Sequence, residues 1–108
     1  MSEAAARFYQ AAEIDQQRGG KLYREFLRVP AMSAGWYVLA AGGSDPQRPH
    51  HEDEMYYVVC GRGRFKAGGE DRAVSAGSVI YVAAEVEHRF YDIVEELAVL
   101  VFFAPAET

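Results

Sequence analysis

Short runs in which apolar and polar residues alternate occupy most of the chain, and this pattern is typical of β-strands. Eight such runs follow Gly20, and clusters rich in glycine separate them. The runs are KLYREFL, GWYVLA, EMYYVVC, GRFKA, DRAVS, SVIYVA, EHRFYDI and LAVLVFF. Several short strands joined by glycine-rich turns predict an all-β sandwich or barrel. Strands do not alternate with long helical segments, so a parallel sheet is not expected.

The segment before the first run predicts a helix instead. Residues from Ser2 to Arg18 are rich in alanine, glutamate and glutamine, which favour helices, and Gly19 and Gly20 would end the helix. A chain of 108 residues fits one small domain. We therefore expect a single domain over residues 1–108, an antiparallel β-barrel with an N-terminal helical extension at residues 1–20.

Turn residues and strand composition refine this expectation. The sequence GRG at 61–63 and the pair Glu95 and Glu96 should form turns, and Gly68 and Gly69 a tight hairpin. The runs MYYVV and AVLVFF are apolar on both faces. One face can fill the barrel, whereas the other needs cover from the helix or from a second subunit. A homodimer is therefore expected.

Composition and charge exclude several classes of function. The formal net charge is −5 and no basic run is present, so no nucleic-acid partner is expected. No apolar run approaches the roughly 20 residues of a membrane-spanning helix, and the start MSEAAARFYQ lacks the features of a signal peptide. Cys60 is the only cysteine, which excludes an internal disulfide and indicates a reducing, cytoplasmic location.

The candidate chemistry lies between Pro49 and Phe90. His50 stands four positions before Glu54, at the start of one apolar run, and His88 begins another. Successive side chains of a strand alternate between its faces, so His50 and Glu54 should share a face. A carboxylate inside a barrel is costly unless it is paired or bound to a metal. Two imidazoles and a carboxylate are the donors that borderline divalent metals prefer.

Two spacings of glycine, histidine and acidic residues support this site. The first, in outline G-x5-H-x-H-x3,4-E-x6-G, is matched by Gly42, His50, Glu54 and Gly61. The second, in outline G-x5-P-x-G-x2-H-x3-N, is matched by Gly77 and His88, with Asp92 where asparagine is common. With both motifs, the stretch from about residue 42 to residue 92 resembles a cupin domain. The resemblance implies a small β-barrel with a divalent metal held by three histidines and one glutamate.

The chain departs from the cupin pattern in both motifs. Arg48 occupies the place of the first histidine of motif one. The usual proline, glycine and proline of motif two are replaced by Ala83, Glu85 and Glu87. By direct match the chain therefore offers only three of the four ligands that the resemblance implies.

Gln47 and His51 are the nearby candidates for the fourth ligand. Freedom in the loop around Pro46 and Pro49 would let Gln47 turn inward and donate its amide oxygen. His51 lies on the other face if the strand is regular there, which makes it the poorer candidate. We therefore predict a site for a divalent transition metal (Fe, Mn, Ni or Zn) built from His50, Glu54, His88 and Gln47.

Several of these residues also have a purely structural explanation. Glu54 could form an ion pair with Arg48 or Arg89 instead of binding a metal. Arg48 either points to solvent, which we favour, or faces inward and grips an anionic ligand.

For other residues near the candidate ligands, the sequence predicts only whether they lie at the surface or in the interior. Glu52 and Asp53 are expected at a solvated rim. Cys60 shares parity with Glu54 and should face the barrel interior, and Tyr81 should belong to the core.

Three functions agree with this sequence. The first is a metal-dependent oxygenase, isomerase or lyase that acts on a small molecule. The second is a non-catalytic module that holds a metal or a small ligand, and the third is a barrel whose site has decayed. Because the cupin barrel hosts many chemistries, the fold does not choose among them. No nucleophile with an adjacent base is evident, so acyl transfer is not expected.

Overall fold

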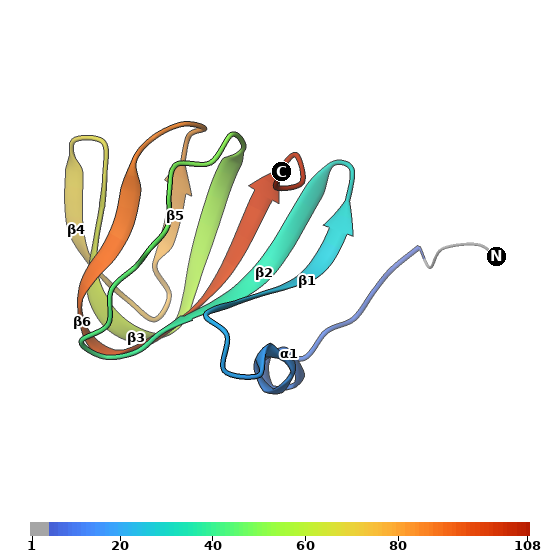
Figure 1. Ribbon diagram of the computed structural model, residues 1–108, viewed down its shortest axis with the longest axis horizontal. Helices are drawn as coiled ribbons and strands as arrows, with labels where there is room; N and C mark the ends of the chain where they lie inside the picture. Colours follow the sequence, from blue (N-terminus) through green and yellow to red (C-terminus); the bar gives the residue numbers. More distant parts are fainter. Residues whose placement is uncertain (1–4) are drawn as a thin grey trace.

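The computed structural model describes residues 5–108 and consists mainly of antiparallel strands with one short helix (Figure 1). The elements are α1 (Ala11–Arg18), β1 (Tyr23–Val29), β2 (Met32–Leu39), β3 (Asp53–Ala67), β4 (Glu70–Ser75), β5 (Val79–Val82) and β6 (His88–Ala104). The predicted antiparallel all-β fold is confirmed. No helix within the described residues is long and apolar enough to cross a membrane.

One sheet contains all the strands and curls into a barrel (Figure 1). The strand order is β1-β2-β6-β3-β4, and β5 pairs with β3 on the same side as β4. The segment 40–52 joins β2 to β3 without regular structure and runs beside the first half of β6. There, the Gly42 amide donates to the Ile93 carbonyl at 2.8 Å. This irregular segment carries two of the four predicted metal ligands to the barrel.

The strands β3 and β6 are each longer than the sequence pattern suggests. Eight runs were expected, but six strands form within residues 5–108, because β3 and β6 continue through the positions predicted as turns. The predictions of turns at 61–63 and at Glu95 and Glu96 were therefore wrong. Register shifts occur between Val58 and Arg64 of β3 instead, so the two strands bend without ending.

Gly61 makes this bend possible. Its φ is 97°, and a Cβ atom there would lie 2.1 Å from the Glu96 carbonyl oxygen. The register shift also interrupts the alternation of faces, because Cys60 pairs with Ala98 only one step after Val58 pairs with Val99. Cys60 is consequently exposed, and the prediction that it faces the interior was wrong.

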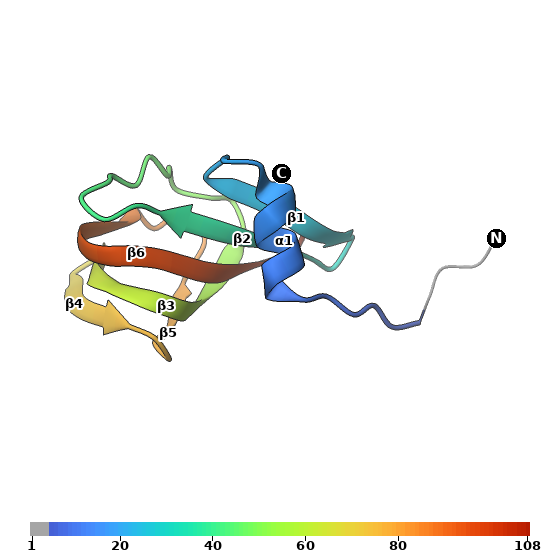
Figure 2. The ribbon, with the colours of Figure 1, turned by 90° about the horizontal axis from the view of Figure 1, so that it is seen from below.

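The helix α1 is shorter than predicted. It starts at Ala11, and residues 6–10 have no regular structure; the first residues of the predicted helix lie outside the described part. Gly19 ends the helix as expected, with φ 63° in the left-handed region. Figure 2 shows α1 lying across the sheet near β1 and β2. Ile14 packs with Trp36, and the Trp36 Nε1 donates to Asp15 Oδ1 at 3.0 Å.

The helix α1 contacts the sheet at β1 and β2, and no helix among the described residues covers the outer face of β3 and β5. The exposed apolar side chains of β3 and β5 are Met55, Tyr57, Val59, Val79 and Tyr81. They are neighbours, because Met55 pairs with Tyr81 and Tyr57 with Val79. We call these five residues the outer apolar patch. Tyr81 is 61% exposed, so the prediction that it belongs to the core was wrong.

Candidate metal centre

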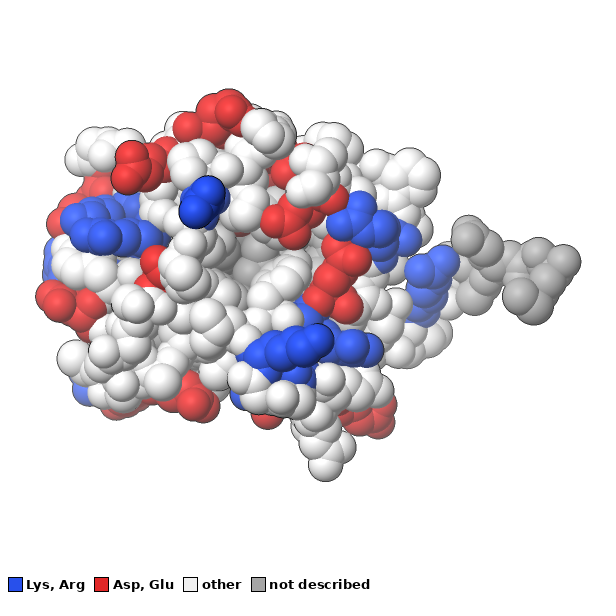
Figure 3. All heavy atoms as spheres, viewed as in Figure 1, with Lys and Arg blue, Asp and Glu red and all other residues white. Residues whose placement is uncertain are grey.

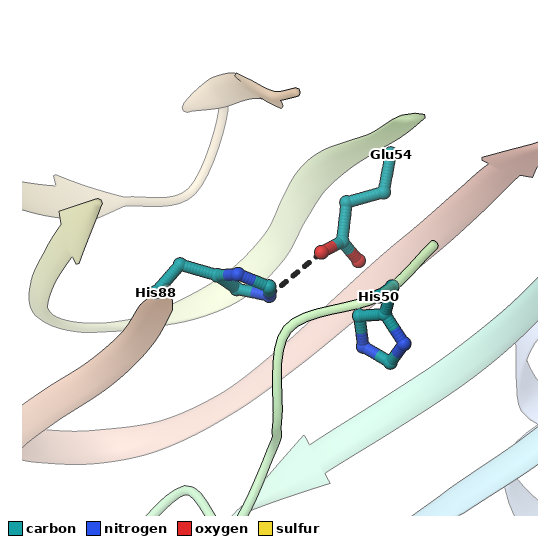
Figure 4. Close-up of side chains that lie close together, drawn as sticks. All are labelled: His50, Glu54 and His88. Carbon is teal, nitrogen blue, oxygen red and sulfur yellow. Dashed lines mark ion pairs between the residues drawn. The ribbon is translucent and has the colours of Figure 1, made fainter. Parts of the chain in front are cut away.

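Three of the predicted ligands meet inside the barrel, near the starts of β3 and β6. Glu54 is the second residue of β3, His88 is the first residue of β6, and His50 comes from the preceding irregular segment. One possible ligand atom from each of the three lies within 4.8 Å of the others. Figure 4 shows Glu54 and His88 directed at each other, with the ring of His50 beside them. His50 thus reaches the site from a loop and not, as expected, from a strand.

Glu54 and His88 approach each other closely without a proper hydrogen bond. His88 Nε2 lies 2.6 Å from Glu54 Oε1, and both side chains are 1% exposed. His88 Nε2 and Glu54 Oε2 are nevertheless both buried without a hydrogen bond to any described residue. An unpaired buried polar atom costs about 1–3 kcal/mol. A cation between these atoms would satisfy both.

The protonation of His88 suits a metal ligand. Its Nδ1 lies 2.8 Å from the Val86 carbonyl oxygen, which can only accept, so Nδ1 carries the hydrogen. In the neutral ring, Nε2 therefore presents a lone pair toward Glu54. Burial by itself would lower the pKa of His88, but contact with Glu54, the bond to Val86 and the charges of Glu54 and Asp45 together raise it above 6.5. The site thus attracts a positive charge, either a proton or a metal ion.

Gln47 is held with its oxygen toward the cluster. Its Nε2 donates to Asp45 Oδ2 at 2.9 Å, and its Oε1 accepts from the Tyr56 hydroxyl at 2.9 Å. Because Asp45 can only accept and Tyr56 donates, the amide orientation is determined. Gln47 Oε1 also lies 3.4 Å from His50 Nε2. The predicted inward turn of Gln47 is seen, although its role as a ligand stays a prediction.

Asp45 organises this part of the site, and the sequence analysis missed it. Its carboxylate also accepts from the Tyr37 hydroxyl at 2.6 Å and from the Phe90 amide at 2.9 Å. It therefore ties the loop to both β2 and β6. The only local signal was an aspartate before Pro46, which is typical of turns in general.

His50 has a second carboxylate beside it that was also missed. Its Nδ1 lies 3.1 Å from Glu107 Oε2, in the segment that follows β6. Burial raises the pKa of Glu107, while the nearby His50 opposes that rise. Glu107 had no signal in the sequence, because it follows the last strand run and belongs to neither motif.

The remaining predicted residues point elsewhere. His51 is 78% exposed and contacts Glu85 at the surface, as expected of the poorer candidate. Arg48 is exposed, which agrees with the favoured solvent orientation. Arg89 is exposed as well, so Glu54 pairs with His88 and with neither arginine.

The acidic pair before β3 is only partly a solvated rim. Asp53 is exposed and accepts from the Ala84 amide, as a rim residue can. Glu52 is 4% exposed, and its Oε2 accepts from the amide and the hydroxyl of Thr108 at 3.1 and 2.9 Å. The prediction for Glu52 was therefore wrong, because a segment distant in sequence covers it.

A cavity of about 210 Å³ adjoins the cluster. It is lined by Tyr23, Tyr37, Gln47, His50, Val101, Phe103 and Glu107. Pockets for drug-sized ligands are usually about 300–1,000 Å³, so this cavity suits a smaller molecule. A larger hollow of about 470 Å³ involves only His88 of the cluster, and we regard the smaller cavity as the relevant one. The face of the molecule in Figure 1 is hollowed near its centre, with acidic side chains beside the hollow (Figure 3).

Comparisons with known proteins agree with this description. The profile of the cupin domain matches residues 35–103. An uncharacterized protein of Streptomyces coelicolor is 46% identical over 98 residues, which cover 89% of this chain and 93% of that protein.

Two solved structures show the same fold at low sequence identity. A cupin 2 conserved barrel domain protein of Rhodopseudomonas palustris has a TM-score of 0.70 at 17% identity, over 80% of this chain and 61% of that chain. The DMSP lyase of Ruegeria pomeroyi has a TM-score of 0.66 at 19% identity, over 70% of this chain and only 39% of its own. The curled antiparallel sheet, the two motifs and the profile match agree, and the chain belongs to the cupin domain family.

Proposed function

We propose that the chain binds one divalent transition metal (Fe, Mn, Ni or Zn) at His50, Glu54 and His88, with the Gln47 amide oxygen as fourth partner. The observation that carries this proposal is the buried contact of Glu54 with His88 beside His50, in which Glu54 Oε2 and His88 Nε2 make no hydrogen bond with a described residue. A buried ion pair is a weak source of stability, because removing two charges from water is costly. Two imidazoles and a carboxylate with one weak neutral donor fit these metals.

We further propose that the metal serves a reaction of a small molecule held in the adjoining cavity. When bound, a metal of this kind acts as a Lewis acid on an oxygen atom of its ligand. Tyr23, Tyr37 and Phe103 line the cavity, and Gln47 keeps its orientation through Asp45 and Tyr56. Burial raises the pKa of Tyr56 well above its usual value, so its hydroxyl stays protonated and remains a donor to Gln47. The lyase activity of the Ruegeria pomeroyi protein, which has the same fold, supports an enzymatic use of such a barrel.

Metal content tests the first step. The purified protein should contain close to one metal ion per chain, and His50→Ala and His88→Ala should each abolish stoichiometric metal while the protein stays folded. His51→Ala is the matched control, because His51 is adjacent in sequence but contacts Glu85 at the surface. Unchanged metal content in both the His50 and His88 variants would refute the site.

Turnover tests the second step. Loaded protein would be assayed with small oxygen-containing compounds for elimination, isomerisation and oxygen uptake. Metal at full occupancy with no turnover of any compound that binds would favour a non-catalytic binding module instead.

We also propose that two copies of the chain pair through the outer apolar patch. Its five side chains are 37–62% exposed and continuous across β3 and β5, which is unusual for a free surface. A reducing, cytoplasmic location stays a prediction, and an exposed free thiol at Cys60 is compatible with it.

Light scattering at micromolar concentration tests the pairing. The unchanged protein should have the mass of a dimer, and Tyr57→Arg should give a monomer because a guanidinium would be buried unpaired in the interface. Val94→Arg serves as control, since Val94 is 62% exposed but lies on β6 outside the patch. A monomeric mass for the unchanged protein would contradict the proposal.

A further inference from the structure

The segment after β6 returns across the barrel and is bonded at each of its last three residues. The Ala106 amide donates to the Pro30 carbonyl at 3.4 Å, and the Glu107 amide donates to Ser33 Oγ at 2.8 Å. Arg28 Nη2 donates to the Glu107 carbonyl at 2.7 Å. The backbone of Glu107 is thus held on both sides by groups from the β1–β2 hairpin.

Thr108 adds a contact to the segment that leads into β3. Its amide and hydroxyl both donate to Oε2 of Glu52, which is buried and stands two residues before Glu54. The segment 105–108 therefore joins the β1–β2 hairpin to the start of β3. Because the backbone is hydrogen-bonded on both sides of the Glu107 Cα, the position of that atom, from which the side chain extends, is fixed.

The carboxylate of Glu107 determines which nitrogen of His50 carries hydrogen. The Glu107 carboxylate, 3.1 Å from His50 Nδ1, is nearer and a stronger acceptor than the Gln47 amide oxygen, 3.4 Å from Nε2, so Nδ1 carries the hydrogen. In the neutral ring, Nε2 then keeps a lone pair on the side of Gln47 Oε1. His88 has the same arrangement, with Nδ1 donating to the Val86 carbonyl and Nε2 facing the cluster. Both imidazoles thus have their hydrogen on the nitrogen that is bonded away from the cluster.

From this geometry we propose that Glu107 is a positioning residue, which fixes the tautomer and ring orientation of His50 for metal binding. This inference rests on the proposed metal site. Carboxylate partners of metal-binding histidines orient the ring and raise its basicity, and their loss typically lowers metal affinity about 10- to 100-fold. Glu107 does this from a segment that lies outside both cupin motifs.

The first experiment measures the tautomer without any metal. Long-range ¹H–¹⁵N spectra of the imidazoles would be recorded in the presence of a chelator, at a pH above the usual titration range of histidine. We expect His50 to carry hydrogen on Nδ1 in the unchanged protein and to lose this preference in Glu107→Ala. Glu107→Gln keeps an amide oxygen that can accept, so it should retain part of the preference. An unchanged His50 tautomer in Glu107→Ala would overturn the proposal.

The second experiment measures affinity for Zn²⁺ by competition with a chromophoric chelator. Glu107→Ala should weaken binding by about 10- to 100-fold and Glu107→Gln by less. The matched control is Glu85→Gln, which removes the same charge from a carboxylate bonded to Nδ1 of His51, outside the cluster. It should change affinity by less than about twofold. Equal losses in the Glu85 and Glu107 variants, or no loss in Glu107→Ala, would overturn the proposal.

The two experiments separate this inference from the proposed function. If the unchanged protein binds no metal, the proposed function fails and with it the role of Glu107 in metal binding. The tautomer spectra would then still decide whether Glu107 orients the His50 ring. If metal binds at the three ligands but the His50 tautomer is the same with and without the Glu107 carboxylate, the proposed function stands and only the positioning role of Glu107 is refuted.

Discussion

The interior of the barrel has two regions that are similarly buried but differ in how much their burial contributes to the stability of the fold. Around Val58, Leu97 and Val99 the side chains are fully buried and apolar. At the other region, Glu54 and His88 are 3% and 4% exposed and each has a polar atom without a hydrogen-bond partner among the described residues. Apolar burial stabilises by about 25 cal/mol per Å², whereas each unpaired polar atom costs about 1–3 kcal/mol. The comparison shows that the core maintains the fold, and it is the basis of our proposal that the polar region binds a metal.

The largest effect is expected in the core. Phe90 is 1% exposed and packs edge-to-face on Tyr56 and Phe65, with ring centroids at 5.2 and 4.6 Å. Phe90→Ala should lower the free energy of unfolding by about 3–5 kcal/mol, as measured by urea denaturation. Val94→Ala, on an exposed position of the same strand, should change it by no more than about 0.5 kcal/mol. A loss below about 1 kcal/mol for Phe90→Ala would show that the core is not tightly packed.

At the polar region, we expect a substitution to raise the free energy of unfolding, by less than the core substitution lowers it. Replacing both Glu54 and His88, as Glu54→Met with His88→Leu, removes the unpaired atoms and leaves apolar side chains of similar size. In the presence of a chelator, the double variant should be more stable than the natural protein by about 1–4 kcal/mol, with metal binding lost. His88→Leu alone should be destabilising, because it leaves the Glu54 charge buried. A double variant less stable than the natural protein would mean that this pair contributes to the fold.

The smallest effect is a dependence of stability on pH. The pKa of His88 is raised above 6.5 in the folded protein, so its protonation stabilises the metal-free fold. That contribution is complete below about pH 6.5, the unfolded value, and is lost as the pH rises through the folded pKa. The melting temperature of the metal-free protein should therefore fall over this range.

Metal should reverse this pH dependence. Metal binding requires deprotonated histidine, so saturating metal should stabilise the protein more as the pH rises. His51→Ala should retain the metal-free profile, and His88→Leu should flatten it. A metal-free profile that is the same with and without His88 would contradict the assigned pKa shift.

The strands were predictable because alternation and turn residues are local signals. Both hairpin glycines, Gly68 and Gly69, lie between β3 and β4 as expected. The exceptions all concern longer-range pairing. Gly61 and the Glu95–Glu96 pair have the composition of turns, yet they face each other where β3 and β6 bend together. Glycine supplies the unusual φ at a bulge as well as at a turn, and only the partner strand distinguishes the two.

The candidate ligands were predictable for a different reason. Histidine and glutamate at the cupin spacings identified His50, Glu54 and His88 from the sequence alone, and Gln47 was inferred from its place in the loop. Asp45 and Glu107 could not be found in this way. An aspartate before proline and a glutamate beyond the last strand are common in any chain, and their roles depend on partners far along the sequence.

The sequence by itself determined the class of fold, the approximate positions of its strands along the chain and the donor types of the site, because these follow from local alternation and from side-chain chemistry. Only the tertiary structure decided which donors meet, since the β3–β6 register places Glu54 opposite Phe103 and His88 opposite Ala67, and only the curling of the sheet brings the two side chains together. It also turned Cys60 outward through a register shift and buried Glu52 under Thr108. The strand register and the packing of residues 105–108 are set by contacts between distant segments, and these contacts leave no local pattern in the sequence.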